Sequence, residues 1–182
     1  MLKRSRTGGR ATARGIAAAA ASVALVLGAG AAPVAAEEWR SITIGESNDA
    51  AQQAELLAYF EAGADDKLAT VSVEETLAAM AGIFDLEGVD TAYSSTALAC
   101  REPGSGLEVS TRNIEVVSPE LYALALVTAG IEDAELLVAA PDDAPALGMT
   151  ALTGVFTTMD GAPCGPGNGA AARQRFALEG LA

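Results

Sequence analysis

Few side chains in this sequence can carry out catalysis, and the missing types restrict the chemistry most. The 182 residues include no histidine, 2 cysteines and 24 acidic residues. Without imidazole there is no Ser-His-Asp or Cys-His nucleophile and no histidine ligand for zinc. A Ser-Lys pair would need Lys67, the only lysine beyond residue 36, which we interpret as a solvated charge at a strand end. We therefore assign no catalytic residue, cofactor or metal site.

Carboxylates are the one abundant reactive group. Pairs such as Glu74–Glu75, Glu132–Asp133 and Asp142–Asp143 would suit glycosidase-type chemistry, which needs two acids at a fixed distance around a sugar. None has the apolar setting that raises a catalytic pKa, and the 8 aromatic residues are few for sugar stacking. Residues 85–90 surround Gly88 with acids but lack the order of a calcium-binding EF-hand loop. We interpret them as an exposed acidic turn.

Residues 145–150 are the best candidate for a ligand site. Gly148 and Thr150 stand where an apolar strand passes into a helix, so free backbone N–H groups can attract an anion there. The segment lacks a phosphate-loop lysine, and an ordinary helix start is the alternative. Because α/β sheets bind ligands at the carboxyl ends of their strands, we name Gly148 and Thr150 as a speculative ligand site. Asp142 and Asp143 nearby would favour a cation or a polar neutral ligand over an anion.

The two cysteines predict a disulfide. Cys100 and Cys164 form an even pair, which in an oxidising compartment is more often a disulfide than a reactive site. The Gly/Pro-rich loop of residues 161–169 would let Cys164 reach the end of the strand that carries Cys100. Two free or intermolecular thiols are the alternative.

Residues 1–36 have the pattern of a secretory signal peptide. A positive front is followed by an uncharged run over residues 15–32 and by small residues at Val34 and Ala36, which predict cleavage after Ala36. The apolar core of residues 16–27 is too short to span a bilayer as a helix. The alternative is an uncleaved N-terminal anchor, since residues 15–36 carry no charge.

The charge of the chain is uneven. The formal charge is −13, but five of the 11 basic residues and none of the 24 acidic ones lie in residues 1–36. Residues 37–182 therefore carry a formal charge of −18. Such a surface repels phosphate backbones and anionic head groups, so we expect neither nucleic acid nor a membrane surface as a partner. The charge would also keep an exported protein soluble.

Hydrophobic periodicity predicts a single α/β domain over residues 37–160, followed by a Gly/Pro loop and a weakly packed C-terminal helix in residues 161–182. Helices are expected from Ser47 or Asn48 to Gly63, from a capping box at Ser72 and Glu75, and from Ser118 to Gly130. A further core helix spans 148–159, where Ala151 and Gly154 permit close approach. The predicted strands lie within residues 37–45, 67–73, 91–101, 107–117 and 135–140.

The order of these elements predicts a mixed sheet. Residues 91–101 and 107–117, joined by the turn at 102–106, are expected to form an antiparallel hairpin. A bulge near Arg112 or Asn113 would keep the apolar side chains on both sides of it facing the core. Residues 107–140 are expected to form a βαβ crossover flanked by helices.

A series of short motifs lies along the chain at residues 43–45, 104–109, 113–114, 118–122, 126–130, 134–135, 138–141 and 150–154. In this order the motifs resemble a known family, the domain-of-unknown-function 1002 family of YpuA-like secreted proteins of Gram-positive bacteria. The resemblance covers most of residues 42–160 and implies export and a shared α/β fold. It implies no activity, cofactor or catalytic residue, and both cysteines look particular to this chain.

Together these features predict a secreted protein, either free or associated with the cell wall, that is a non-catalytic binding or interaction domain. Its partner would be an extracellular or cell-envelope molecule that the sequence does not name. The alternative is a carboxylate-dependent hydrolase acting on a cell-envelope polymer.

Overall fold

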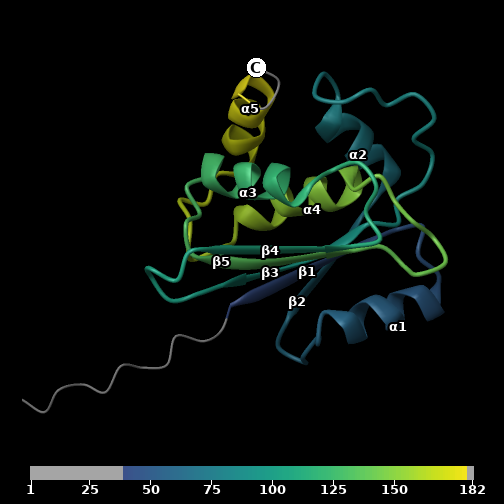
Figure 1. Ribbon diagram of the computed structural model, residues 1–182, viewed down its shortest axis with the longest axis horizontal. Coiled ribbons are helices and arrows are strands. Elements are labelled where there is room, and N and C mark those ends of the chain that lie inside the picture. The colour runs from purple at the N-terminus through teal and green to yellow at the C-terminus, as the bar shows by residue number, and fades with distance from the viewer. Residues whose placement is uncertain (1–38, 180–182) are drawn as a thin grey trace, which may run out of the picture. The chain divides into compact units, whose positions relative to one another are not determined.

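Segments rich in apolar and β-branched residues give five short strands in the computed structural model, which describes residues 39–179. The predicted signal peptide and its cleavage position lie outside the described residues. The strands pair in the order β2-β1-β3-β5-β4 (Figure 1). Their bounds are β1 Arg40–Gly45, β2 Lys67–Val71, β3 Ser95–Cys100, β4 Leu107–Arg112 and β5 Ala134–Ala139.

The sheet is mixed, as predicted. β1 pairs in parallel with β2 and antiparallel with β3, while β5 pairs antiparallel with β3 and in parallel with β4. The crossover from β4 to β5 through a helix is therefore confirmed. Residues 39–179 form a single α/β domain, and none of the helices in this range has the length and apolar character to cross a membrane.

The predicted antiparallel hairpin is wrong. β3 and β4 follow one another along the chain, but β5 lies between them and pairs with both. The reason lies in the character of the strands. β5 is apolar and four of its six residues are buried, so it takes an interior position, whereas β4 alternates half-buried residues with Glu108 and exposed Ser110 and tolerates the edge.

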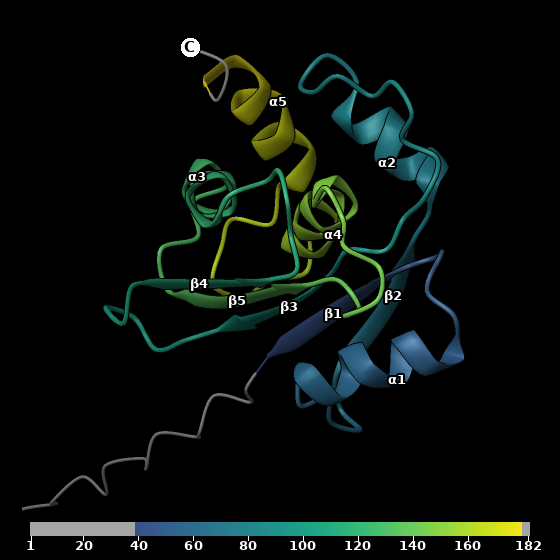
Figure 2. The same cartoon turned by 45° about the vertical axis from the view of Figure 1, so that its right-hand side comes forward.

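Helices cover both faces of the sheet unequally. One face is covered by α1 (Ala50–Tyr59), where Leu56 and the C-cap residue Phe60 pack onto Ile42 and Ala97. The other four helices lie on the opposite face, where they enclose the larger core (Figures 1 and 2). These helices are α2 Val73–Met80, α3 Pro119–Thr128, α4 Met149–Met159 and α5 Gly169–Glu179.

α4 lies at the centre of the larger core. All its residues except Thr157 are buried. Gly154 permits the close approach that the sequence predicts, because a Cβ there would lie 2.1 Å from the Oγ1 atom of Thr43. Thr43 in turn shares a buried hydrogen bond of 2.8 Å with Thr96. The helix therefore packs closely on the side chain of Thr43 in β1.

Local caps start the helices. The predicted capping box of Ser72 and Glu75 is confirmed at α2. The cap of α1 is neither of the predicted residues, Ser47 and Asn48, but Asp49, which forms a capping box with Gln52. Asn48 is instead buried and donates its amide to the carbonyl oxygens of Gly45 and Tyr93, at 2.7 and 2.9 Å. It ties the start of α1 to the segment before β3.

The predicted bulge is also wrong. β4 ends at Arg112, and Asn113 takes a left-handed conformation with φ of 59°. Ile114 then pairs with Ala146, and Val116 is 50% exposed rather than facing the core. The chain changes direction through one positive φ instead of an extra strand residue.

The C-terminal region packs more firmly than predicted. Phe176 of α5 is 1% exposed and meets the ring of Phe156 edge-on, with 5.7 Å between ring centroids. The predicted disulfide joins Cys100 at the end of β3 to Cys164, with 5.6 Å between their Cα atoms. Helix α5 is thus held by its own apolar face, which is buried in the core.

Candidate functional site

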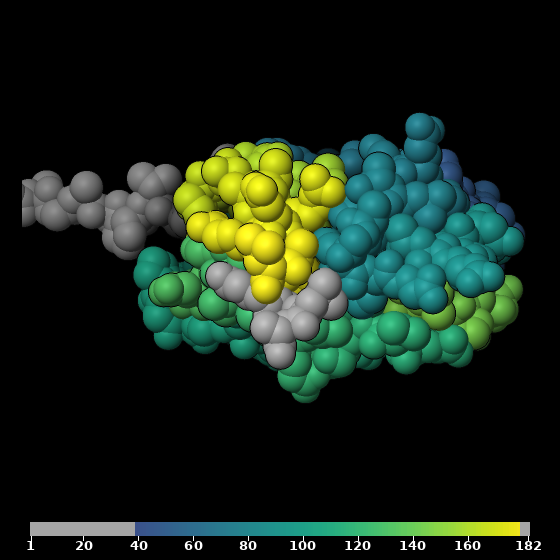
Figure 3. All heavy atoms as spheres, turned by 90° about the horizontal axis from the view of Figure 1, so that it is seen from above, coloured from purple at the N-terminus to yellow at the C-terminus, as the bar shows by residue number. Residues whose placement is uncertain are grey.

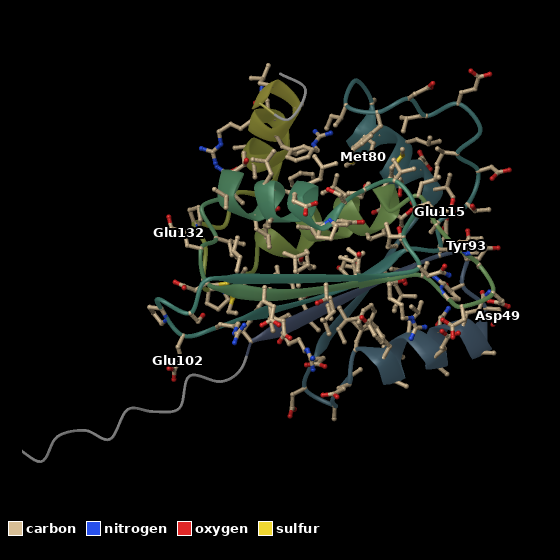
Figure 4. The ribbon with its side chains drawn as sticks, viewed as in Figure 1. Asp49, Met80, Tyr93, Glu102, Glu115 and Glu132 are labelled. Atoms are coloured by element: carbon tan, nitrogen blue, oxygen red, sulfur yellow. A yellow bond between two sulfur atoms is a disulfide. The ribbon has the colours of Figure 1, made fainter. Side chains whose placement is uncertain are left out.

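The predicted ligand residues Gly148 and Thr150 line one hollow of about 80 Å³, where the chain enters α4. We call it the pre-α4 hollow. Its opposite wall comes from a segment that the sequence did not associate with the site, and the lining residues there are Gly88, Val89, Thr91, Tyr93 and Ser94. Tyr93 of this wall and Glu115 lie at one end of the sheet, while Glu102 and Glu132 lie at the other end (Figure 4). The hollow is at the carboxyl ends of β4 and β5, where α/β sheets place ligands.

Gly148 gives the hollow its shape. Its φ is 99°, and a Cβ there would lie 2.6 Å from the hydroxyl oxygen of Tyr122. That hydroxyl donates to the carbonyl oxygen of Gly148 at 2.8 Å. Burial raises the pKa of Tyr122, so the side chain remains a neutral donor. Glycine is therefore required here by both backbone conformation and space.

Hydroxyl groups hold the first turn of α4 against the rest of the domain. Ser94 accepts the backbone N–H of Ala151 at 2.9 Å, and Thr76 donates to the hydroxyl of Thr150 at 3.3 Å. The hollow is also lined by Thr91 and Tyr93, and no acidic or basic side chain of the described residues contributes to its wall. The site can therefore make neutral hydrogen bonds, but it has no cation to balance an anion.

The size of the hollow limits what it can hold. Pockets for small-molecule ligands usually measure about 300–1,000 Å³, well above 80 Å³. The space matches one side-chain-sized group. Two exposed apolar side chains stand beside it: Leu147 in its wall is 39% exposed, and Val116 is 50% exposed on the adjacent segment, where Val117 donates to the carbonyl oxygen of Leu147.

The predicted carboxylate pairs are not brought together. Glu75 caps α2, and Asp133 accepts a backbone hydrogen bond from Gly106 at the far end of the sheet. Asp143 accepts the side-chain amide of Gln52 on the α1 side. These acids thus serve three separate local structures. Among residues 39–179, no cluster of three or more acidic or cysteine side chains is arranged to hold a metal.

Two carboxyl groups, those of Glu120 and Asp133, have a pKa below the ordinary value. The Ser118 hydroxyl and backbone hydrogen bonding lower the pKa of Glu120. Backbone N–H groups of Gly106 and Gly104 lower that of Asp133. A general acid working near neutral pH needs a raised pKa instead.

An ion-pair cluster joins α1 to the sheet, and the sequence did not predict it. Arg112 at the end of β4 contacts the carboxylates of Glu55 and Asp142 and lies 4.5 Å above the ring centroid of Tyr59. Asp142 also donates its backbone N–H to Glu55 at 3.2 Å. Three segments far apart in sequence supply these residues, so no local motif could reveal them. The arrangement stabilises the position of α1.

A second hollow, of about 660 Å³, lies between α2 and α5, which are side by side in Figures 2 and 3. Ile83 and five alanines give it apolar walls, and Asn168, Arg173 and Gln174 add polar groups. Arg173 donates to the carbonyl oxygens of Ala78 and Ala79 at the end of α2, at 3.3 and 3.1 Å. The guanidinium therefore joins the two helices.

The family model described as "Protein of unknown function (DUF1002)" matches residues 44–165. The chain belongs to the DUF1002 family. The match contains both walls of the pre-α4 hollow and ends before α5, so one wall of the α2–α5 hollow lies outside the DUF1002 region.

Comparison with individual proteins gives a similar result. The "Uncharacterized protein YpuA" of Bacillus subtilis (strain 168) is 43% identical over 65 residues, which are 36% of this chain and 22% of YpuA. The aligned part is thus less than a quarter of the relative's length. No solved structure matches the chain.

Proposed function

We propose that this DUF1002 protein is an exported, non-catalytic interaction domain, which binds an extracellular or cell-envelope partner through the pre-α4 hollow. The observation that carries the proposal is the uncharged, hydroxyl-lined wall of that hollow, with Leu147 and Val116 exposed beside it. An uncharged polar group of the partner would enter the hollow, and apolar parts of the partner would cover the two exposed side chains.

The size of the hollow favours a group that belongs to a larger partner. A volume of about 80 Å³ holds one side chain or one small sugar substituent rather than a complete metabolite. The charge of −18 on residues 37–182 would keep anionic polymers away. A neutral glycan or a neutral protein segment suits the site best.

Export is supported by two features. The pattern of residues 1–36 is typical of a secretory signal peptide, and the Cys100–Cys164 disulfide suits an oxidising compartment.

The second candidate is a carboxylate-dependent hydrolase, which the two carboxylates of Glu55 and Asp142 around Arg112 favour. Both are engaged by the guanidinium, and a hydrolase of this class needs one carboxyl group that stays protonated near neutral pH. Binding is therefore the better supported function.

Backbone amide shifts of the labelled protein, titrated with N-acetylglucosamine oligomers and with neutral serine- and asparagine-containing peptides, test the proposal. We expect saturable shifts at residues 91–94 and 146–150, which Tyr93→Phe and Thr91→Val weaken. Tyr59→Phe is the matched control, because Tyr59 lies on α1. Product release that disappears in a Glu55→Gln variant would establish the hydrolase instead, and shifts confined to residues 102–106 would remove the chosen site.

A further inference from the structure

The geometry points to the outer edge of β2 as a second binding surface, which takes an extended, basic-ended segment of another protein as an added strand. This surface is distinct from the pre-α4 hollow. Strand addition requires free backbone N–H and C=O groups along the edge and no side chain that blocks them. It also requires charges beside the edge that select the incoming chain.

The hydrogen-bonding direction of β2 leaves two residues facing outward. Val71 accepts the backbone N–H of Glu46 at 3.0 Å, so its peptide groups point toward β1. In a parallel pair this direction alternates along the strand, so Lys67 and Ala69 also bond to β1. The N–H and C=O groups of Leu68 and Thr70 then point away from the sheet. Among residues 39–179, only β1 pairs with β2.

The side chains of β2 do not protect this edge. Natural sheets commonly block an edge strand with a lysine, a proline or a bulge. Lys67, the one charged residue of β2, directs its ammonium group over the ring of Trp39, at 5.6 Å from the centroid. β2 contains no proline, and its pairing with β1 is continuous over five residues. Leu68 is 61% exposed.

The opposite edge of the sheet is different. β4 carries charged side chains in ion pairs, Glu108 with Arg101 at 2.7 Å and Arg112 with Glu55 and Asp142. Charged side chains along an edge strand disfavour pairing with another chain. The accessible edge is therefore β2, where one of the two outward-facing residues, Leu68, is apolar and exposed.

Charge determines the class of partner. Asp65 lies before β2 and Glu74 after it, and both are exposed. An extended segment beside β2 would place its two ends near these carboxylates, so lysine or arginine at both ends would be favoured. A second copy of this chain, paired about Ala69, would place Asp65 of each copy near Glu74 of the other, and like charges would repel. The occupant is therefore a basic-ended strand with an apolar residue beside Leu68.

The peptide acetyl-Lys-Thr-Val-Thr-Val-Thr-Lys-amide is a direct probe, titrated into the labelled full chain. We expect amide shifts at residues 67–71 and slower hydrogen exchange at the N–H groups of Leu68 and Thr70. Replacement of both peptide lysines by glutamate should weaken binding, and added salt should reduce the difference. Equal binding of the two peptides, or self-association of the chain through β2, would overturn the proposal.

Proline substitution separates strand addition from ordinary surface contact. Thr70→Pro removes an outward N–H without breaking a bond to β1, so it should weaken peptide binding about fivefold or more per lost hydrogen bond. Thr70→Ala keeps that N–H and should bind as the wild type does. Equal affinity of the two variants would overturn the proposal.

If Thr70→Pro does not fold, methylated peptides provide the test on the wild-type chain. One peptide is N-methylated at both valines and the other at two of its threonines. Because alternate N–H groups of a strand face opposite edges, one methylated peptide should lose binding and the other keep it. Equal effects of the two modifications would contradict strand addition.

Discussion

The hydroxyl of Tyr122 lies 2.8 Å from the carbonyl oxygen of Gly148, and this hydrogen bond joins α3 to the start of α4 within the core. Tyr122 is fully buried, and its hydroxyl oxygen occupies part of the space that a side chain on residue 148 would need. The shape of the pre-α4 hollow thus depends on a glycine and a tyrosine from two different elements.

Gly148→Ala is expected to destabilise the domain by more than about 2 kcal/mol, because a positive φ and a close contact with Tyr122 add together. Gly104→Ala is the matched control: its φ is 87°, but a Cβ there meets nothing within 4 Å. The control should lose only about 1 kcal/mol. Urea denaturation measures both, and equal losses would show that crowding at Tyr122 contributes nothing.

Removal of the disulfide with Cys100→Ser and Cys164→Ser is expected to lower the free energy of unfolding by about 2–4 kcal/mol. The two cysteines are 64 positions apart, so the bond restricts a long loop of the unfolded chain. Thermal or urea denaturation with and without reductant measures this loss. Reductant should destabilise the wild type and leave the double variant unchanged, and an equal effect on both proteins would contradict the prediction.

Phe176→Ala is expected to cost about 3–5 kcal/mol, the usual loss for a buried phenylalanine. Leu178 on the same helix is 74% exposed, and Leu178→Ala should change stability by less than about 0.5 kcal/mol. Denaturation curves of the two variants compare buried and exposed positions of α5. A small loss for Phe176→Ala would show that α5 is only weakly packed, as the sequence predicts.

Asp133 is expected to make stability depend on pH at the acidic end. Backbone hydrogen bonds from Gly106 and Gly104 lower its pKa below the ordinary value of 3.8. The ionised form is thus favoured in the folded state, and its contribution is complete above 3.8 and is lost as pH falls through the lower folded pKa. A carboxyl-carbon NMR titration should give a midpoint below 3.8. Asp133→Asn should flatten this part of the stability curve, and an unchanged curve would contradict the prediction.

The sequence alone determined features that depend on a few neighbouring residues. The Ser72–Glu75 capping box, the left-handed Gly130 after α3 and the glycine at the start of α4 arise from hydrogen bonds and steric limits within one turn. The β4–α3–β5 crossover was predictable because its strands are joined by a single helix. Gly148 and Thr150 were predictable as neighbours because one short segment carries both.

Tertiary structure decided which separate segments meet. β5 enters between β3 and β4 because its apolar residues are buried by packing on both sides, a gain that the short turn between β3 and β4 could not reveal. The same packing brings residues 88–94 to the hollow, Arg112 to Glu55, and α5 to α2. It also leaves β2 at an edge. The position of a strand in a sheet depends on competition among all the strands for apolar neighbours. The local sequence of β2 indicates only how the side chains of that strand alternate.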